Sequence, residues 1–249
     1  MIGKVARRTK AALRAFLRRF GVDVQRYRHT LLAVRGRLLQ ELAIDFVVDV
    51  GGNQGQYAAQ LRTSGYRGRI VSFEPLAEAF SILAVRAAAD LLWDVRRVAL
   101  GELDGKLALN VAANSASSSL LPMLDRHLEA APYSHYVRTE ECPVVRLDSI
   151  AEEILGTARR VFLKLDVQGY EMSVLRGATA TLSRVAVVES ELSLVPLYAG
   201  QALLPEVVTF LQEAGFELVF LERGFVDQRT GHILQMDGVF LRRGPTGGH

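Results

Sequence analysis

Residues 46–57 read Phe46-Val47-Val48-Asp49-Val50-Gly51-Gly52-Asn53-Gln54-Gly55-Gln56-Tyr57. The apolar run at its start predicts a buried strand, the glycines predict a tight turn, and a helical pattern begins directly after them. Glycine permits positive φ and a close approach of the backbone to a ligand, and the first N–H groups of a helix lack partners within it. The segment therefore predicts a strand–turn–helix unit that binds a ligand at its turn.

The glycine spacing indicates which ligand. Dinucleotide enzymes carry G-x-G-x-x-G at such a turn, whereas Asp49, Gly51 and Gly55 here form D-x-G-x-x-x-G. An acid sits poorly beside a pyrophosphate but suits a cofactor with a cationic sulfonium and ammonium. This pattern favours S-adenosylmethionine, and an NAD(P)-dependent oxidoreductase is the alternative.

A second acid follows at the expected distance. The next apolar run ends in Phe73-Glu74-Pro75, and Glu74 lies 23 residues beyond Gly51. An acid at that place can accept hydrogen bonds from both ribose hydroxyls, and Pro75 ends the strand because it lacks a ladder donor. The predicted cofactor-binding residues are Asp49, Gly51, Gly52, Asn53, Gly55, Glu74 and Ala99.

Short β-rich runs alternate with helical patterns along the chain, which indicates a parallel sheet. Strands are expected at 46–50, 70–74, 94–98, 161–166, 185–191, 217–221 and 238–242. Helices are expected at about 26–42, 57–64, 77–89, 149–155, 171–181 and 204–214. The prediction is an α/β fold with three layers, α/β/α, around a mostly parallel seven-stranded sheet. The alternation lapses between Leu107 and Val145, where residues 114–119 are expected to form a flexible polar loop near the ligand.

The charge lies mainly at one end. Of a formal net charge of only +3, seven cationic residues and no acid fall within residues 1–20. We expect a basic helical N-terminal extension at 1–43, a single domain at 44–243 and a disordered tail at 244–249. A basic amphipathic helix suits peripheral contact with an anionic membrane surface, but packing on the domain explains the same pattern.

The composition argues against a membrane-spanning protein, a disulfide-stabilised protein and a nucleic-acid-binding protein. No uncharged apolar run approaches the about 20 residues that span a bilayer, and a single cysteine, Cys142, excludes an intrachain disulfide and suits a reducing cytoplasm. Nucleic acid is not an expected partner, because aromatic residues do not alternate with the basic ones.

With these residues identified, the sequence resembles the FkbM family of methyltransferases. The elements that carry the resemblance are 48–55, 73–75, 99–101, 146–149, 189–192, 235–240 and, most specifically, Leu163-Lys164-Leu165-Asp166-Val167-Gln168-Gly169-Tyr170-Glu171. Gly52 stands where alanine is expected and Gln168 where glutamate is common.

The resemblance implies a Rossmann-like class I methyltransferase fold and O-methyl transfer from S-adenosylmethionine, often to sugar hydroxyls of glycolipids or polysaccharides. The basic arm further resembles actinobacterial members that act on cell-envelope glycolipids. The sequence indicates no oligomeric state.

An alcohol becomes a good nucleophile only as its proton leaves, so a carboxylate is expected as general base. Asp166, at the end of the fourth strand, is the first candidate, and Glu191 and Glu171 are expected to orient the acceptor or share the role. Asp166, Glu191 and Asp237 leave a Mg²⁺ site open as an alternative, but a metal is not predicted. A scaffold that has lost catalysis is the non-enzymatic alternative.

Overall fold

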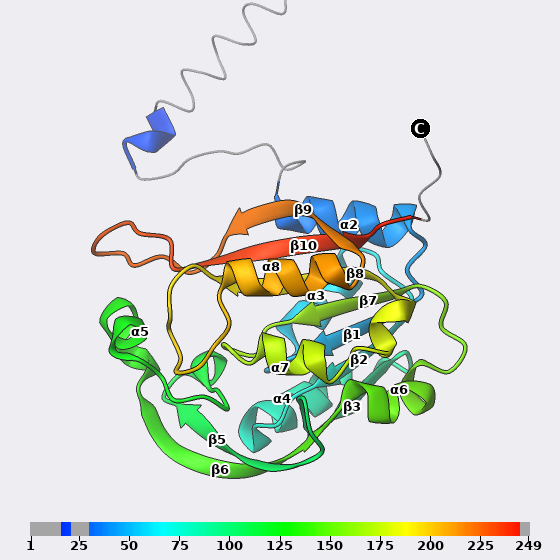
Figure 1. Ribbon diagram of the computed structural model, residues 1–249, viewed down its shortest axis with the longest axis horizontal. Coiled ribbons are helices and arrows are strands. Elements are labelled where there is room, and N and C mark those ends of the chain that lie inside the picture. Colours follow the sequence, from blue (N-terminus) through cyan, green and yellow to red (C-terminus); the bar gives the residue numbers. More distant parts are fainter. Residues whose placement is uncertain (1–15, 21–29, 245–249) are drawn as a thin grey trace, which may run out of the picture.

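The computed structural model describes residues 16–20 and 30–244, and its centre is a seven-stranded sheet in the order β3-β2-β1-β7-β8-β10-β9 (Figure 1). Its strands are β1 (Phe46–Val50), β2 (Arg69–Phe73), β3 (Trp93–Arg96), β7 (Val161–Leu165), β8 (Val185–Ser193), β9 (Phe216–Arg223) and β10 (Gln235–Arg242). Only β10 runs against the others, since it pairs antiparallel with both β8 and β9. The predicted mostly parallel sheet is confirmed.

Helices cover both faces of this sheet, as the prediction of three layers requires (Figure 1). One face packs against α2 (Leu31–Glu41), α3 (Gln56–Thr63) and α4 (Ala77–Ala87). The other face packs against α6 (Leu147–Leu155), α7 (Glu171–Arg176) and α8 (Leu204–Glu213). Burial on both sides explains why strands β1 and β7 are uninterrupted apolar runs apart from one charged residue each.

Helix α2 lies within the segment predicted as an N-terminal extension and packs on the sheet. The Thr30 side chain caps it by accepting a hydrogen bond from the Ala33 N–H. Glu222 of β9 accepts from the Leu31 N–H at 2.7 Å. The rest of the arm, including most of the basic helix expected at 1–20, lies outside the described residues, as does nearly all of the tail. None of the described helices is long and apolar enough to cross a bilayer.

A second, smaller sheet was missed by the sequence pattern. It consists of β4 (Ala99–Leu100), β5 (Gly105–Ala112) and β6 (Tyr136–Val145), in the order β4-β6-β5, with the short helix α5 (Asp125–Ala130) between its longer strands. Most side chains of β5 and β6 are exposed or half-buried. The apolar alternation that predicts a strand is therefore absent, although the two strands pair without a break in register from Gly105 to Val111.

Helix α7 is shorter than predicted. It ends at Arg176 and is followed by Gly177, where an added Cβ atom would collide with the carbonyl oxygen of Gly101. The predicted continuation to residue 181 is replaced by a separate 3₁₀ turn at Thr181–Arg184. The end of this helix therefore packs closely on Gly101, the residue that follows β4.

Candidate active site

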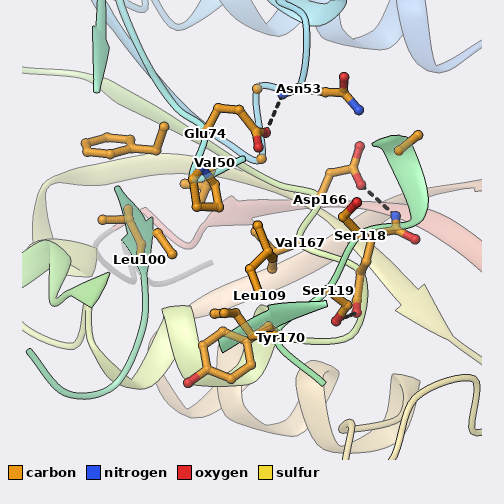
Figure 2. A pocket seen from close by; sticks show the side chains of 18 of the residues that line it. Val50, Asn53, Glu74, Leu100, Leu109, Ser118, Ser119, Asp166, Val167 and Tyr170 are labelled. Atoms are coloured by element: carbon orange, nitrogen blue, oxygen red, sulfur yellow. Dashed lines mark hydrogen bonds between the residues drawn. The ribbon is translucent and has the colours of Figure 1, made fainter. Parts of the chain in front are cut away.

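A cavity of about 440 Å³ opens where the carboxyl ends of β1, β2, β7 and β8 meet. Figure 2 shows Glu74, Asn53 and Asp166 on one side of it and Leu100, Leu109 and Tyr170 on the other. Its further lining includes Val50, Gly51, Gly52, Gln56, Tyr57, Phe73, Val98, Ala99, Ser115, Ser118, Ser119, Lys164, Val167, Gln168 and Glu191. The cavity thus has an apolar wall facing a wall of charged and polar groups, a combination typical of small-molecule sites.

The glycine turn after β1 forms part of the floor. Gly51 and Gly52 line the cavity, but an added Cβ at Gly51 would collide with the Asp166 carbonyl, and one at Gly52 would lie 3.0 Å from the Ser72 Cβ. Gly55 does not line the cavity; it precedes α3 at a φ of 82° and packs on Trp93. Gly51 and Gly55 have the positive φ that the sequence predicted, and close packing of the turn on neighbouring residues is a second reason for glycine at these positions.

Asp49 is not where the prediction put it. Its side chain is fully buried and absent from the cavity wall. It accepts a hydrogen bond from the Ser72 hydroxyl at 2.8 Å and lies 3.3 Å from the Lys164 ammonium. In this structure β1 is a central strand covered on both faces, and Asp49 is connected to the cavity through its ion pair with Lys164, which lines it.

Glu74 lies at the cavity as predicted. Its two oxygens accept hydrogen bonds from the Asn53 and Leu76 N–H groups, each at 2.8 Å (Figure 2 shows the first). Burial raises the pKa of Glu74 to about 7, although those two hydrogen bonds favour the charged form. A buried carboxylate beside a glycine turn is suited to accept hydrogen bonds from a ligand's hydroxyl groups.

Lys164 and Asp166 project from the end of β7. The Lys164 ammonium donates to the Gly51 carbonyl at 3.1 Å and lies 3.3 Å from Asp166. Burial disfavours the charged ammonium, but the attraction of Asp166 and Asp49 outweighs it and raises the pKa of Lys164 above its usual value. Asp166 lines the cavity and is partly exposed to it. Lys164 is therefore paired with two carboxylates, Asp49 inside the sheet and Asp166 at the cavity.

Glu191 also lines the cavity, and Gln168 joins it to Asp166. The Gln168 amide nitrogen donates to Asp166 Oδ1 and to Glu191 Oε2, each at 2.9 Å. Burial, followed by the charges of Asp166 and Glu171, raises the pKa of Glu191 well above its usual value. Sequence reasoning noted Gln168 only as a departure from a family pattern and did not foresee that it bridges the two acids.

The third catalytic candidate, Glu171, is buried away from the cavity wall. One of its oxygens accepts hydrogen bonds from the N–H groups of Val167 and Gly169, at 3.0 and 3.2 Å. Its carboxylate therefore holds the turn that carries Gln168, instead of contacting an acceptor as predicted. Asp237, on β10, is also absent from the lining, and the described part of the chain contains no cluster of three potential metal-ligating side chains.

The stretch predicted as a flexible polar loop is a packed 3₁₀ turn, Ser115–Ser117, whose side chains and neighbours close the cavity. Ser115 donates to the Asn53 side chain at 3.2 Å, and Ser119 donates to the Gln168 carbonyl at 2.7 Å. These contacts connect the second sheet to both the glycine turn and the acidic pair. The run of small polar residues at 114–119 did not predict these contacts.

The model of the methyltransferase FkbM domain matches residues 49–218, which is more than half of the chain. The chain belongs to this family. The matched segment begins at Asp49 and includes Glu74, Asp166 and Glu191, while helix α2 lies outside it. With its seven-stranded sheet and one reversed strand, this FkbM-family chain has the predicted Rossmann-like class I methyltransferase fold.

Individual relatives are distant. "Methyltransferase 1" of Beauveria bassiana (strain ARSEF 2860) is 29% identical over 143 residues, which are 53% of this chain and 57% of the relative. The chain therefore covers little more than half of that relative's length.

Two solved structures are similar at lower identity. The methyltransferase FkbM from Methylobacillus flagellatus KT is 14% identical, with a TM-score of 0.46 over 78% of this chain and 43% of the other. An rRNA methylase from Streptococcus thermophilus is 11% identical, with a TM-score of 0.47 over 90% and 100%.

Proposed function

We propose that this FkbM-family chain transfers a methyl group from S-adenosylmethionine to a hydroxyl group, and that the acceptor is a sugar of a glycolipid or polysaccharide. The observation that supports the proposal most directly is the cavity itself. Its polar wall carries the Glu74 carboxylate and the Asp166–Glu191 pair, and an apolar wall faces them.

The groups that line the cavity fit this cofactor. Glu74 is a buried carboxylate with lone pairs free for ribose hydroxyls beyond its two backbone hydrogen bonds. Leu100, Leu109 and Tyr170 offer an apolar surface for a nucleobase. The acidic end at Asp166 suits a cationic centre. The cofactor supplies an electrophilic methyl group when it is bound.

Asp166 is the group that takes the acceptor proton in this proposal. It is the acid of the cavity that is best exposed to it, and Lys164 and Gln168 each hold one of its oxygens. A carboxylate held in this way can accept a proton from a hydroxyl that lies within hydrogen-bond reach. Glu191, whose pKa burial raises well above its usual value, lies beside Asp166 and can form a hydrogen bond with the acceptor that orients it.

The sugar acceptor is proposed on the family resemblance and on the polar groups beside Asp166. Ser115, Ser118 and Gln56 line the same cavity and offer neutral hydrogen-bond donors and acceptors. Neutral polar groups of this kind suit a polyhydroxylated molecule better than a phosphate-rich one. Membrane contact through the basic arm is part of the same proposal, because it would bring the enzyme to lipid-linked sugars.

The first test measures ligand binding. Isothermal titration calorimetry with S-adenosylhomocysteine should show binding to the wild-type protein, with NAD and NADP giving none. Glu74→Ala should abolish that binding, whereas Glu78→Ala, which removes an exposed acid on α4, should not change it. Tight binding of a nicotinamide nucleotide alone would refute the proposal.

The second test measures transfer. Protein incubated with methyl-labelled cofactor and a cell-envelope glycolipid extract should label a glycolipid, and mass spectrometry should find one added methyl group. Labelling of protein or nucleic acid in the extract, but of no glycolipid, would contradict the proposed acceptor class.

A further inference from the structure

The side chain of Gln168 stands at the centre of a hydrogen-bonded group that the sequence did not reveal. Its amide nitrogen contacts Asp166 and Glu191, and its amide oxygen accepts a hydrogen bond from the Tyr198 hydroxyl at 2.9 Å. Gln168 has a φ of 54°, a conformation that non-glycine residues adopt rarely. An unusual backbone conformation held by many contacts indicates that the position of this side chain matters.

Tyr198 determines which way the amide faces. Its ring is fully buried, packs edge-on against His127 and lies against Gly169, the residue next to Gln168. The hydroxyl donates to the amide oxygen, so both amide hydrogens are directed at the two acids. A flipped amide would turn its oxygen toward the Asp166 carboxylate and would lose both donated hydrogen bonds.

We infer that Gln168, oriented by Tyr198, is the positioning residue that fixes Asp166 and Glu191 relative to each other at the cavity. The amide acts as a neutral bridge between two acids that would otherwise repel each other. Lys164 holds the second oxygen of Asp166 from the opposite side. The role of Asp166 as a base rests on the proposed function, but the bridge itself does not.

The bridge has a consequence that can be measured on Glu191 without any substrate. The charged groups that face Glu191 are Asp166, Glu171 and Asp237, which disfavour its ionised form, and Lys164, which favours it. A hydrogen bond donated by Gln168 also favours the ionised form. Loss of the amide should therefore raise the pKa of Glu191 further.

The experiment follows the carboxyl carbon of Glu191 by NMR during a pH titration, with Glu191→Gln used to assign the signal. Gln168→Asn keeps an amide and tolerates positive φ, but it is one methylene too short to span both acids. Tyr198→Phe removes only the hydroxyl that orients the amide. Tyr66→Phe is the matched control, since it removes a buried tyrosine hydroxyl that donates to the Arg69 carbonyl elsewhere in the fold.

The expected result is a rise of about one unit in the pKa of Glu191 in Gln168→Asn, a smaller rise in Tyr198→Phe and none in Tyr66→Phe. An unchanged titration in both Gln168→Asn and Tyr198→Phe, or an equal shift in Tyr66→Phe, would overturn the inference. If Gln168→Asn does not fold, the comparison of the Glu191 pKa in Tyr198→Phe with that in Tyr66→Phe tests the inference by itself.

Activity gives a second readout that separates this inference from the proposed function. Gln168→Asn should lower kcat about tenfold to a hundredfold and change the Kd for S-adenosylhomocysteine much less, because the Gln168 amide contacts the two acids and not Glu74. A wild-type protein that binds no S-adenosylhomocysteine would refute the proposed function, while the titration would still report on the bridge.

Discussion

At the scale of single residues, the acids of the site differ in what surrounds them. Glu74 is enclosed between backbone N–H groups, and Asp166 is open to the cavity between Lys164 and Gln168. Sequence position predicted that both would lie at strand ends. The neighbours that make Glu74 enclosed and Asp166 open to the cavity come from other strands and loops. Their identity could not be predicted from the position of the two acids in the sequence.

Cofactor affinity should depend on pH through Glu74. Burial raises the pKa of Glu74 to about 7 in the free protein, and ribose hydroxyls bind its ionised form. The Kd for S-adenosylhomocysteine should therefore rise about tenfold per pH unit below pH about 7 and level off above it. Calorimetry between pH 5.5 and 8.5 (roughly, the range that spans this pKa) measures the effect. A flat profile would contradict the assignment of Glu74 to the ribose.

Removing the base should affect chiefly the chemical step. Asp166→Asn keeps the size of the side chain but cannot accept the acceptor's proton, so kcat should fall by about a hundredfold or more. The Kd for S-adenosylhomocysteine should change little. Asp125→Asn, at an exposed aspartate of α5, is the matched control and should retain full activity. Unchanged transfer by Asp166→Asn would assign the base to another group.

At the scale of elements, the ends of β1 and β7 fit together closely. The turn after β1 passes so near the residue after β7 that only a glycine is tolerated at position 51. Lys164 ties the same two strand ends through the Gly51 carbonyl. The site is thus built where the ends of two strands meet. The backbone of the glycine turn is held there by close packing and by the hydrogen bond from Lys164.

Gly51→Ala should reduce stability. Gly51 has a φ of 78°, and its new Cβ would collide with the Asp166 carbonyl, so the free energy of unfolding should fall by about 3 kcal/mol. Urea denaturation followed by circular dichroism measures this. Gly36→Ala is the control, because α2 is helical there and nothing lies within 4 Å of an added Cβ. It should stabilise the protein by about 0.5–1 kcal/mol. Similar effects of the two substitutions would disprove the packing argument.

At the scale of the whole molecule, a row of polar side chains crosses the sheet beneath the site. Ser72, Asp49, Lys164 and Glu189 occupy matching positions on four neighbouring strands. Arg35 of α2 completes the row with two hydrogen bonds to Glu189, at 2.8 and 2.6 Å. Helix α2, outside the matched family domain, therefore balances charge in the interior of that domain.

Removing only one partner of the Arg35–Glu189 ion pair should reduce stability strongly. Both side chains are 7% exposed, so Arg35→Met leaves an unpaired buried carboxylate and should lower the free energy of unfolding by about 3–5 kcal/mol. The double variant Arg35→Met/Glu189→Leu, which removes both charges, should be less destabilised than Arg35→Met alone. Urea unfolding of the wild type, Arg35→Met, Glu189→Leu and the double variant measures the interaction free energy between the two side chains. A double variant at least as unstable as the single one would show that the charge pair is not the cause.

The sequence by itself determined the strands of the main sheet and the helices that cover it, the glycine turn, and the placing of Glu74, Asp166 and Glu191 near the carboxyl ends of their strands. Periodicity and glycine spacing are local properties, and the carboxyl ends of parallel strands necessarily meet at one edge of the sheet. Only the tertiary structure decided that Asp49 and Glu171 turn away from the cavity, that an exposed second sheet closes it, and that Gln168 bridges the acids. Those outcomes depend on which side chains meet across strands and loops far apart in the chain, and such contacts leave no periodic trace in the sequence.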